Sequence, residues 1–490
     1  MIKENNPTMA FGVCQPFEKG VLGCERYRIP AMITLNNGDV LAAADNRHSH
    51  GQDAPQNLDI LTAVSSDRCM SWNYSYADYF DDCKDGTESK NSASYNDSAV
   101  IQSKETGRIF IATSAFPSGC GAFKSKRGTG FIKDENGVLR LALTDKEEAS
   151  DISEYKYHVG EYDGGFAKIV GADKNYTVDK ELNIYLDGEP VFTKQINSDE
   201  TTRQNVFFTS SDFHIFPTCY LVVRHSDDNG ATWSEPHILN PFVKGEKETF
   251  YGVCPGRGAV TTVNGKERII FCAYNIMSGV ERVSSVYTDD NGKTWQRGES
   301  MKHERGLRKS SESQIISMPD GNLRIFCRNF SKLVGTAVSE DGGVTWSLLR
   351  ADKNLYCTKN CMVSFINTSK YIGGKQVVLG SYACGGEERK NGVIRSGLMD
   401  EKGQIEWKSS LRLNSGFFAY SCLNELQGGT IACLFEDEPA HITLRLFEIN
   451  DDCSVRPTDG VYYNEPIRQK PSAKERIKAF FMKLTDFSAE

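Results

Sequence analysis

The chain has 490 residues, with 57 Lys and Arg against 65 Asp and Glu, so its formal net charge is −8. Hydrophobic residues make up 39% and charged residues 25%, an ordinary globular composition. The mild negative charge, without a block of five like charges, argues against nucleic-acid binding or docking on an anionic membrane. An anionic substrate must therefore meet local positive charge.

The start of the chain lacks the apolar stretch and small-residue cleavage site of a secretory signal, and no long apolar run follows. We expect no stable membrane insertion and a cytoplasmic location, with an extracellular location by another route as the alternative. The 15 cysteines, from Cys14 to Cys453, form no CxxC pair. This pattern predicts reduced, mostly buried thiols.

One turn pattern, S/T-x-D-x-G-x-T-W, recurs along the chain. In such a turn the Asp accepts hydrogen bonds from following amides, the Gly adopts positive φ, and the Trp packs on the sheet below. A degraded copy has Cys69 in place of Gly and Ser71 in place of Thr. The four copies are SSDRCMSW at 65–72, SDDNGATW at 226–233, TDDNGKTW at 288–295 and SEDGGVTW at 339–346.

Short alternating or apolar runs separated by Gly- and Asn-rich turns surround these Asp boxes. Many short strands with one repeated turn are typical of radially repeated four-stranded sheets, so the pattern predicts an all-β propeller. The 161-residue gap between Trp72 and Trp233 is too long for one blade, and a disordered linker is the alternative to an insertion there. We predict an N-terminal extension at 1–20, a propeller at 21–117 and 206–470, an inserted β-rich domain at 118–205 and a helical tail at 471–490.

The segment YRIP at Tyr27 to Pro30, followed by Asp boxes, resembles the sialidase (neuraminidase) family over about residues 20 to 465. The resemblance implies a six-bladed β-propeller with Asp-box repeats, and the insertion resembles that of the larger bacterial sialidases. It also implies a glycoside hydrolase that needs no cofactor. Its partner would be a sialylated glycan, and we expect a monomer.

A sialoside carries a carboxylate on its anomeric carbon, and the planar fork of Arg suits carboxylate binding. The resemblance implies three such arginines. Arg28 of YRIP matches the first, Arg328 lies 16 residues after Glu312 as the second requires, and Arg389 lies 31 residues before Tyr420 as the third requires. Each Arg alone would be read as a structural residue, but their shared order and spacing favour a binding site.

The same resemblance makes Tyr420 the nucleophile and Glu312 its base. A carboxylate nucleophile would be repelled by the carboxylate of the sugar, whereas a neutral phenol would not. Because few phenols ionise at neutral pH, a carboxylate must take the proton during attack, and the arginines should favour phenoxide character. Taken alone, Tyr420 would be read as a core aromatic in a strand.

Asp53, in the loop ADNRHSHGQDAP, matches the general acid that later activates water, and we expect burial or the substrate anion to raise its pKa. A loop-capping Asp is the alternative. Arg47 and Asp97 resemble the pair that holds the 4-hydroxyl of the sugar. Glu436, 16 residues after Tyr420, resembles the carboxylate that orients the first Arg.

His48-x-His50 could suggest a metal pair, but two His without further spaced ligands do not predict a metal site. The sequence thus predicts a retaining exo-α-sialidase that works through a tyrosyl-sialyl intermediate on glycoproteins, glycolipids or oligosaccharides. Transfer to another sugar, or to a hydroxyl of the same sialic acid, is the alternative. A non-catalytic Asp-box propeller that binds ligands is a third.

Overall fold

The computed structural model describes residues 13–80, 92–149, 151–194 and 200–463. Strands dominate these ranges, and the helices in them are α1 (Asn240–Val243) and two single 3-10 turns, Val21–Gly23 and Ile152–Glu154. The expected all-β fold is therefore confirmed. The predicted helical tail at 471–490 lies outside the described residues.

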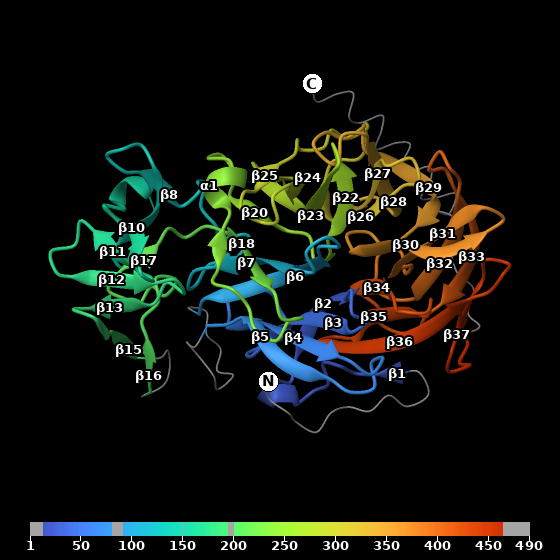
Figure 1. The fold of residues 1–490 in the computed structure, drawn as a ribbon, viewed down its shortest axis with the longest axis horizontal. Coiled ribbons are helices and arrows are strands. Elements are labelled where there is room, and N and C mark those ends of the chain that lie inside the picture. The colour runs from blue at the N-terminus through green and yellow to red at the C-terminus, as the bar shows by residue number, and fades with distance from the viewer. Residues whose placement is uncertain (1–12, 81–91, 150, 195–199, 464–490) are drawn as a thin grey trace.

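Six antiparallel groups of strands build the main body, and they follow one another along the chain (Figure 1). The first is β2 (Tyr27–Thr34), β3 (Val40–Arg47), β4 (Leu58–Ser65) and β5 (Asn73–Asp78). The second is β6 (Ser94–Gln102), β7 (Ile109–Phe116), β18 (Tyr220–Ser226) and β19 (His237–Ile238). The third is β20 (Phe250–Val253), β22 (Ala259–Val263), β23 (Lys266–Met277), β24 (Val280–Thr288) and β25 (Gln296–Arg297).

The remaining groups have the same up-and-down order. The fourth is β26 (Ser310–Ser317), β27 (Leu323–Asn329), β28 (Leu333–Ser339) and β29 (Arg350–Tyr356). The fifth is β30 (Val363–Ile372), β31 (Lys375–Ala383), β32 (Gly392–Met399) and β33 (Ile405–Arg412). The sixth is β34 (Ser421–Glu425), β35 (Ile431–Glu438), β36 (His441–Ile449), β37 (Val455–Pro457) and β1 (Val13–Cys14). A short strand, β21 (Gly256–Arg257), pairs in parallel with β6.

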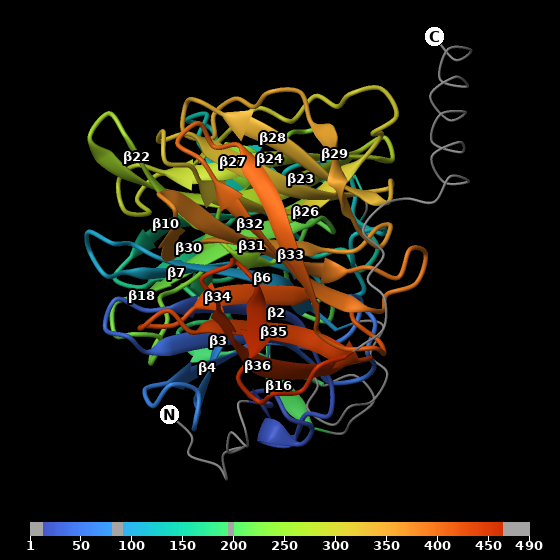
Figure 2. The ribbon, with the colours of Figure 1, turned by 90° about the vertical axis from the view of Figure 1, so that its right-hand side faces the viewer.

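Apolar side chains between neighbouring groups close the six into a ring. Each interface has its own buried cluster, including one that joins the sixth group back to the first through Met32, Ala42, Cys422 and Leu434. Strands of these two groups, blue and red, lie together in Figure 2. Residues 13 and 14, expected in an N-terminal extension, instead pair with β36. The architecture is a β-propeller.

Each Asp box joins the last two strands of its group, in the first, second, third and fourth groups. In the second group, Asp228 Oδ1 accepts from the Ser226 hydroxyl at 2.8 Å and from Thr232 N at 2.9 Å, and Gly230 has φ 84°. In the degraded copy, Cys69 is fully buried with φ 71°. The turn chemistry predicted for these repeats is thus present even where Gly is replaced.

The insertion enters the second group between β7 and β18, and it projects to one side of the ring (Figure 1). Its main sheet runs from residue 131 to residue 215, so it extends past the predicted end at 205, because β17 pairs back with β9. Buried Arg224 of the propeller pairs with Glu181 of the insertion at 2.7 Å. The strands of the insertion are β8 (Phe131–Lys133), β9 (Leu139–Thr144), β10 (Tyr157–Asp163), β11 (Phe166–Val170), β12 (Tyr176–Asp179), β13 (Ile184–Leu186), β14 (Glu189–Pro190), β15 (Phe192–Lys194), β16 (Thr201–Arg203) and β17 (His214–Ile215).

Candidate active site

Backbone irregularities in the first strands of three groups place site residues. The register of β2 shifts between Arg28 and Ala31, that of β6 around Asp97, and that of β26 around Glu312. Ile29 has φ 61°, which is an outlier for a β-branched residue. Such bulges re-aim side chains and are common beside active sites.

Glu436, on β35, explains the strained backbone at Ile29. Its carboxylate is fully buried and accepts from Arg28 Nε at 3.1 Å, from Arg28 Nη2 at 3.3 Å and from Ile29 N at 3.0 Å. The left-handed turn at Ile29 allows both the main chain and the Arg28 side chain to reach one carboxylate. This pairing raises the pKa of Arg28 although burial opposes it, so Arg28 is a fixed cation.

Tyr420, just before β34, lies at the centre of the predicted residues. Its hydroxyl donates to Glu312 Oε1 at 2.5 Å and accepts from Arg328 Nη1 at 2.6 Å, and Arg328 also pairs with Glu312 Oε2. Burial raises the pKa of Tyr420 well above its usual value, although Arg328 acts in the opposite direction. The phenol is therefore neutral at neutral pH and needs a base to ionise.

The other two arginines lie over the ring of Tyr420. The guanidinium carbon of Arg28 is 5.6 Å from the ring centroid and that of Arg389 is 5.2 Å from it. Asn360 links two of the three arginines, since its side-chain oxygen accepts from Arg328 Nε at 2.9 Å and its carbonyl accepts from Arg389 Nη2 at 3.3 Å. Three cations from three different groups of strands thus lie around one phenol and form a site suited to a carboxylate.

Asp53 reaches this cluster from the loop between β3 and β4. Its Oδ1 lies 2.9 Å from Arg47 Nη2 and 3.8 Å from Arg28 Nη1, and 71% of its side chain is exposed. Desolvation by the surrounding site would by itself raise the pKa of Asp53, but Arg47 and Arg28 together lower it below its usual value. These surroundings therefore do not give the expected increase in pKa, and the carboxyl of Asp53 is ionised at neutral pH.

Arg47 lies behind the site rather than on its surface. Its side chain is fully buried, with Nη1 donating to Gly51 O at 2.8 Å and Nη2 to Asp45 Oδ2 at 2.8 Å. The guanidinium therefore holds Asp53 in place, with Nη2 at 2.9 Å from Asp53 Oδ1, and its predicted contact with the 4-hydroxyl of a sugar stays a prediction. Burial and the nearby carboxylate of Asp45 raise the pKa of Asp97 well above its usual value, and half-buried Asp97 can therefore donate a hydrogen bond.

Sequence reasoning missed three contributors. Asp45, whose pKa burial raises to about 6, accepts from the Asp97 amide at 3.0 Å. Asn360, which has φ 56°, is the second contributor. Its place as a polar residue between Cys357 and Cys361 is only a weak sequence signal for a site residue. Burial raises the pKa of Tyr274 on β23 strongly, with Glu312 as the next cause, and no local pattern indicated its place near the site.

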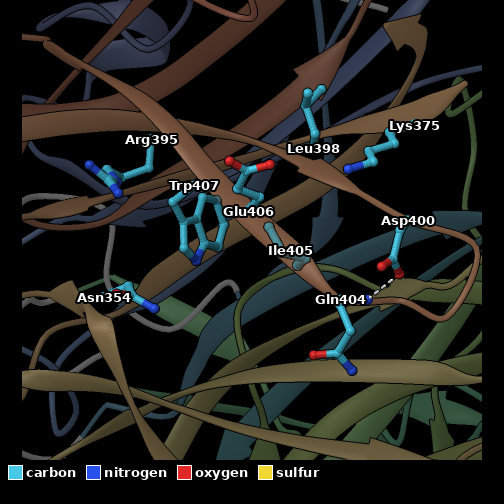
Figure 3. A pocket seen from close by; sticks show the side chains of 9 residues that line it. All are labelled: Asn354, Lys375, Arg395, Leu398, Asp400, Gln404, Ile405, Glu406 and Trp407. Atoms are coloured by element: carbon cyan, nitrogen blue, oxygen red, sulfur yellow. Dashed lines mark hydrogen bonds between the residues drawn. The ribbon is translucent and has the colours of Figure 1, made fainter. Parts of the chain in front are cut away.

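A surface hollow of about 580 Å³ lies elsewhere, on the fifth sheet, with Arg395, Trp407, Lys375 and Glu406 among its lining residues (Figure 3). None of the predicted site residues lines it. In the described part of the chain, no group of three or more His, Cys, Asp or Glu could hold a metal ion. His48 instead pairs with Asp59 at 2.7 Å. Among the described helices, none is long and apolar enough to cross a membrane.

A closed ring of sheets with Asp-box turns, carrying three arginines around a buried Tyr–Glu pair, defines a class of repeat propeller. Residues 179–433 match the family of BNR repeat-like domains. The match covers more than half of the chain. With the relatives described next, it shows that the chain belongs to the sialidase family.

Two curated relatives span most of this chain. An anhydrosialidase of Macrobdella decora is 31% identical over 446 residues, which are 84% of this chain and 58% of the relative. Sialidase B of Streptococcus pneumoniae is 27% identical over 439 residues, 84% of this chain and 61% of the relative. The chain therefore spans about three fifths of the length of these relatives.

Solved structures agree. An intramolecular trans-sialidase from Ruminococcus gnavus, in complex with oseltamivir carboxylate, superposes with a TM-score of 0.81 at 29% identity, covering 90% of this chain and 98% of that chain. A leech intramolecular trans-sialidase complexed with 2,7-anhydro-Neu5Ac gives a TM-score of 0.79 at 29% identity, covering 87% and 68%.

Proposed function

We propose that this protein is a retaining exo-α-sialidase that removes terminal sialic acid from glycoproteins, glycolipids or oligosaccharides. The observation that carries the proposal is the convergence of Arg28, Arg328 and Arg389 on Tyr420, whose hydroxyl donates to Glu312. An acid sugar supplies the anion that such a trio would bind, and its anomeric carbon would then lie beside the phenol.

In the first step, Tyr420 Oη attacks the anomeric carbon and forms a carbon–oxygen bond while the glycosidic bond breaks. Glu312 takes the phenolic proton, for which the 2.5 Å hydrogen bond is already in place. Arg328, on the same hydroxyl at 2.6 Å, stabilises the negative charge that develops on the oxygen. The product is a tyrosyl-sialyl intermediate.

Asp53 donates a proton to the departing glycosidic oxygen and later takes one from the attacking water. Its low pKa in the free protein comes from Arg47 and Arg28. A substrate carboxylate bound to Arg28 would offset part of that positive charge and bring an anion close to Asp53, so substrate binding should raise the pKa of Asp53. The acid form would thus be created where it is needed.

Intramolecular transfer is the second candidate, in which a hydroxyl of the same sialic acid replaces water in the second step. It is favoured by the relatives, which include an anhydrosialidase and two intramolecular trans-sialidases. Transfer to another sugar would use the same residues. All three outcomes share the first step and the same intermediate.

The test is incubation with 3′- and 6′-sialyllactose, with lactose release as the measure of cleavage. Mass spectrometry then separates free sialic acid from the anhydro product, which is lighter by one water. We expect the wild-type protein to release lactose, and we expect the Tyr420→Phe variant to lose this activity. A folded wild-type protein that releases lactose from neither substrate would contradict the proposal.

A further inference from the structure

The loop that carries Asp53 leaves the sheet between β3 and β4. At its base, the amide of His48 donates to the carbonyl of Asn57 at 3.3 Å. Asp53 lies at the far end, with 71% of its side chain exposed. An exposed loop end must be held by side chains if the carboxyl is to keep one position.

Gln56 provides such a hold from inside the loop. Its side chain is fully buried, and its amide oxygen accepts from His50 N at 3.0 Å and from Ser49 N at 3.3 Å. Its amide nitrogen donates to His50 O at 2.9 Å and to the carbonyl of Gln52. One side-chain amide therefore forms hydrogen bonds with four main-chain groups. These bonds take the place of the regular strand-to-strand hydrogen bonds of a β-ladder.

A second segment supports the loop from outside. Gly121 is buried against the carbonyl of Ala54, and a Cβ on Gly121 would lie only 2.4 Å from that oxygen. The segment is itself fixed, since Ser118 N donates to Phe207 O at 2.9 Å and Ser125 N to Gly121 O at 3.0 Å. This segment leads from β7 into the insertion, so the insertion is connected to the Asp53 loop.

We infer that Gln56 and Gly121 are positioning residues for the general acid, with Gln56 holding the Asp53 loop from within and Gly121 allowing the insertion's entry segment to support Ala54. The inference rests on the proposed function, because it assigns the acid role to Asp53. A general acid must lie within hydrogen-bond reach of the leaving oxygen, and a displacement of about 1 Å costs roughly 100-fold in rate.

The experiment compares two leaving groups. Lactose leaves 3′-sialyllactose as a poor leaving group that needs a proton, whereas the phenol of a 4-methylumbelliferyl sialoside leaves without much help. In Gln56→Met, which keeps the side-chain length but loses the amide, kcat/KM should fall about 30-fold or more further on sialyllactose than on the aryl sialoside. A merely structural defect would lower both to the same extent.

Gln102→Met is the matched control. Gln102 is also buried, and its side chain also holds main-chain groups by hydrogen bonds. It accepts from Asn36 N at 2.6 Å and donates to Gly107 O at 2.7 Å. It lies at the end of β6, five residues beyond Asp97, about 17 Å along the strand. This variant should have the wild-type ratio of the two kcat/KM values.

Gly121→Ala tests the support that the segment around Gly121 gives to the Asp53 loop. If Gln56→Met does not fold, the result for Gly121→Ala alone tests the positioning inference. Gly245→Ala is its control, because a Cβ there would meet its nearest neighbour, Glu248, at an ordinary 3.4 Å. Asp53→Asn serves as the reference. Gly121→Ala should share the selective loss on sialyllactose that Asp53→Asn shows, and Gly245→Ala should not.

The outcomes separate the two claims. If Asp53→Asn lowers kcat/KM equally on both substrates, the acid assignment of the proposed function fails and this inference fails with it. If Asp53→Asn is selective but folded Gln56→Met and Gly121→Ala are not, only the positioning inference is overturned. Selective loss in all three variants, with unchanged ratios in Gln102→Met and Gly245→Ala, supports it.

Discussion

Replacing Glu436 with Gln should weaken both the fold and the binding of substrate. Glu436 is fully buried, pairs with Arg28 through two hydrogen bonds and also accepts from Ile29 N. Removing one partner of a buried ion pair costs about 3 to 5 kcal/mol, and because Gln keeps one acceptor oxygen we expect about 3 kcal/mol of unfolding free energy.

The effect on catalysis should appear mainly in KM. Arg28 binds the substrate carboxylate in the ground state and the transition state alike, so a displaced guanidinium weakens both to a similar extent. A hydrogen bond to a charged group contributes about 2 kcal/mol, which corresponds to an increase in KM of about 30-fold. Steady-state kinetics on 3′-sialyllactose measure KM and kcat, and denaturant unfolding measures the free energy of unfolding.

Asp459→Asn is the matched control for this variant. Asp459 forms a largely buried, two-point pair with Arg445 at 2.8 Å, and Arg445 also donates to the carbonyls of Leu413 and Val461, none of them site residues. This control should lose stability with an unchanged KM. If Glu436→Gln raises KM no more than Asp459→Asn does, the reasoning about Arg28 is refuted.

Three further outcomes follow. Tyr420→Phe should lower kcat on sialyllactose at least about 1000-fold while the protein still unfolds near the wild-type temperature, and a smaller kinetic loss would remove the nucleophile role. Calorimetry in buffers of different ionisation enthalpy should show proton uptake when sialic acid binds near pH 6, because the ligand anion raises the low pKa of Asp53; Asp53→Asn should abolish the uptake, and uptake that persists would argue against this residue. Asp228→Ala, which removes an Asp-box acceptor, should cost about 1 kcal/mol of unfolding free energy with kcat/KM unchanged, and a large activity loss would contradict a purely structural turn.

Local features of the fold could be predicted from the sequence because their chemistry is local. The Asp boxes are closed by hydrogen bonds within seven residues, as at Ser226 to Thr232, so their pattern is sufficient to predict the turn. Long-range pairings were not predictable in this way. The strand at residues 13–14 pairs with β36, and β17 pairs back with β9. These pairings cross the domain boundaries predicted at residues 20 and 205.

The site shows the same division. The resemblance to sialidases predicted that Arg28, Arg328 and Tyr420 lie together, and the structure brings them together from different groups of strands. Burial and charge balance could not be derived from spacing. Arg47 is fully buried and pairs with Asp53, and together with Arg28 it lowers the pKa of that carboxyl below its usual value. Such outcomes depend on the sum of contacts from several strands and loops.

Covalent trapping tests the central claim most directly. A sialyl fluoride that also carries fluorine at C3 reacts readily because fluoride leaves well, while the C3 fluorine slows breakdown of the intermediate, so the covalent adduct accumulates. Peptide mass spectrometry should find the fluorosialyl mass on Tyr420, with no adduct in Tyr420→Phe. An adduct on Glu312 or Asp53, or full turnover of the reagent with Tyr420 unmodified throughout, would contradict the account.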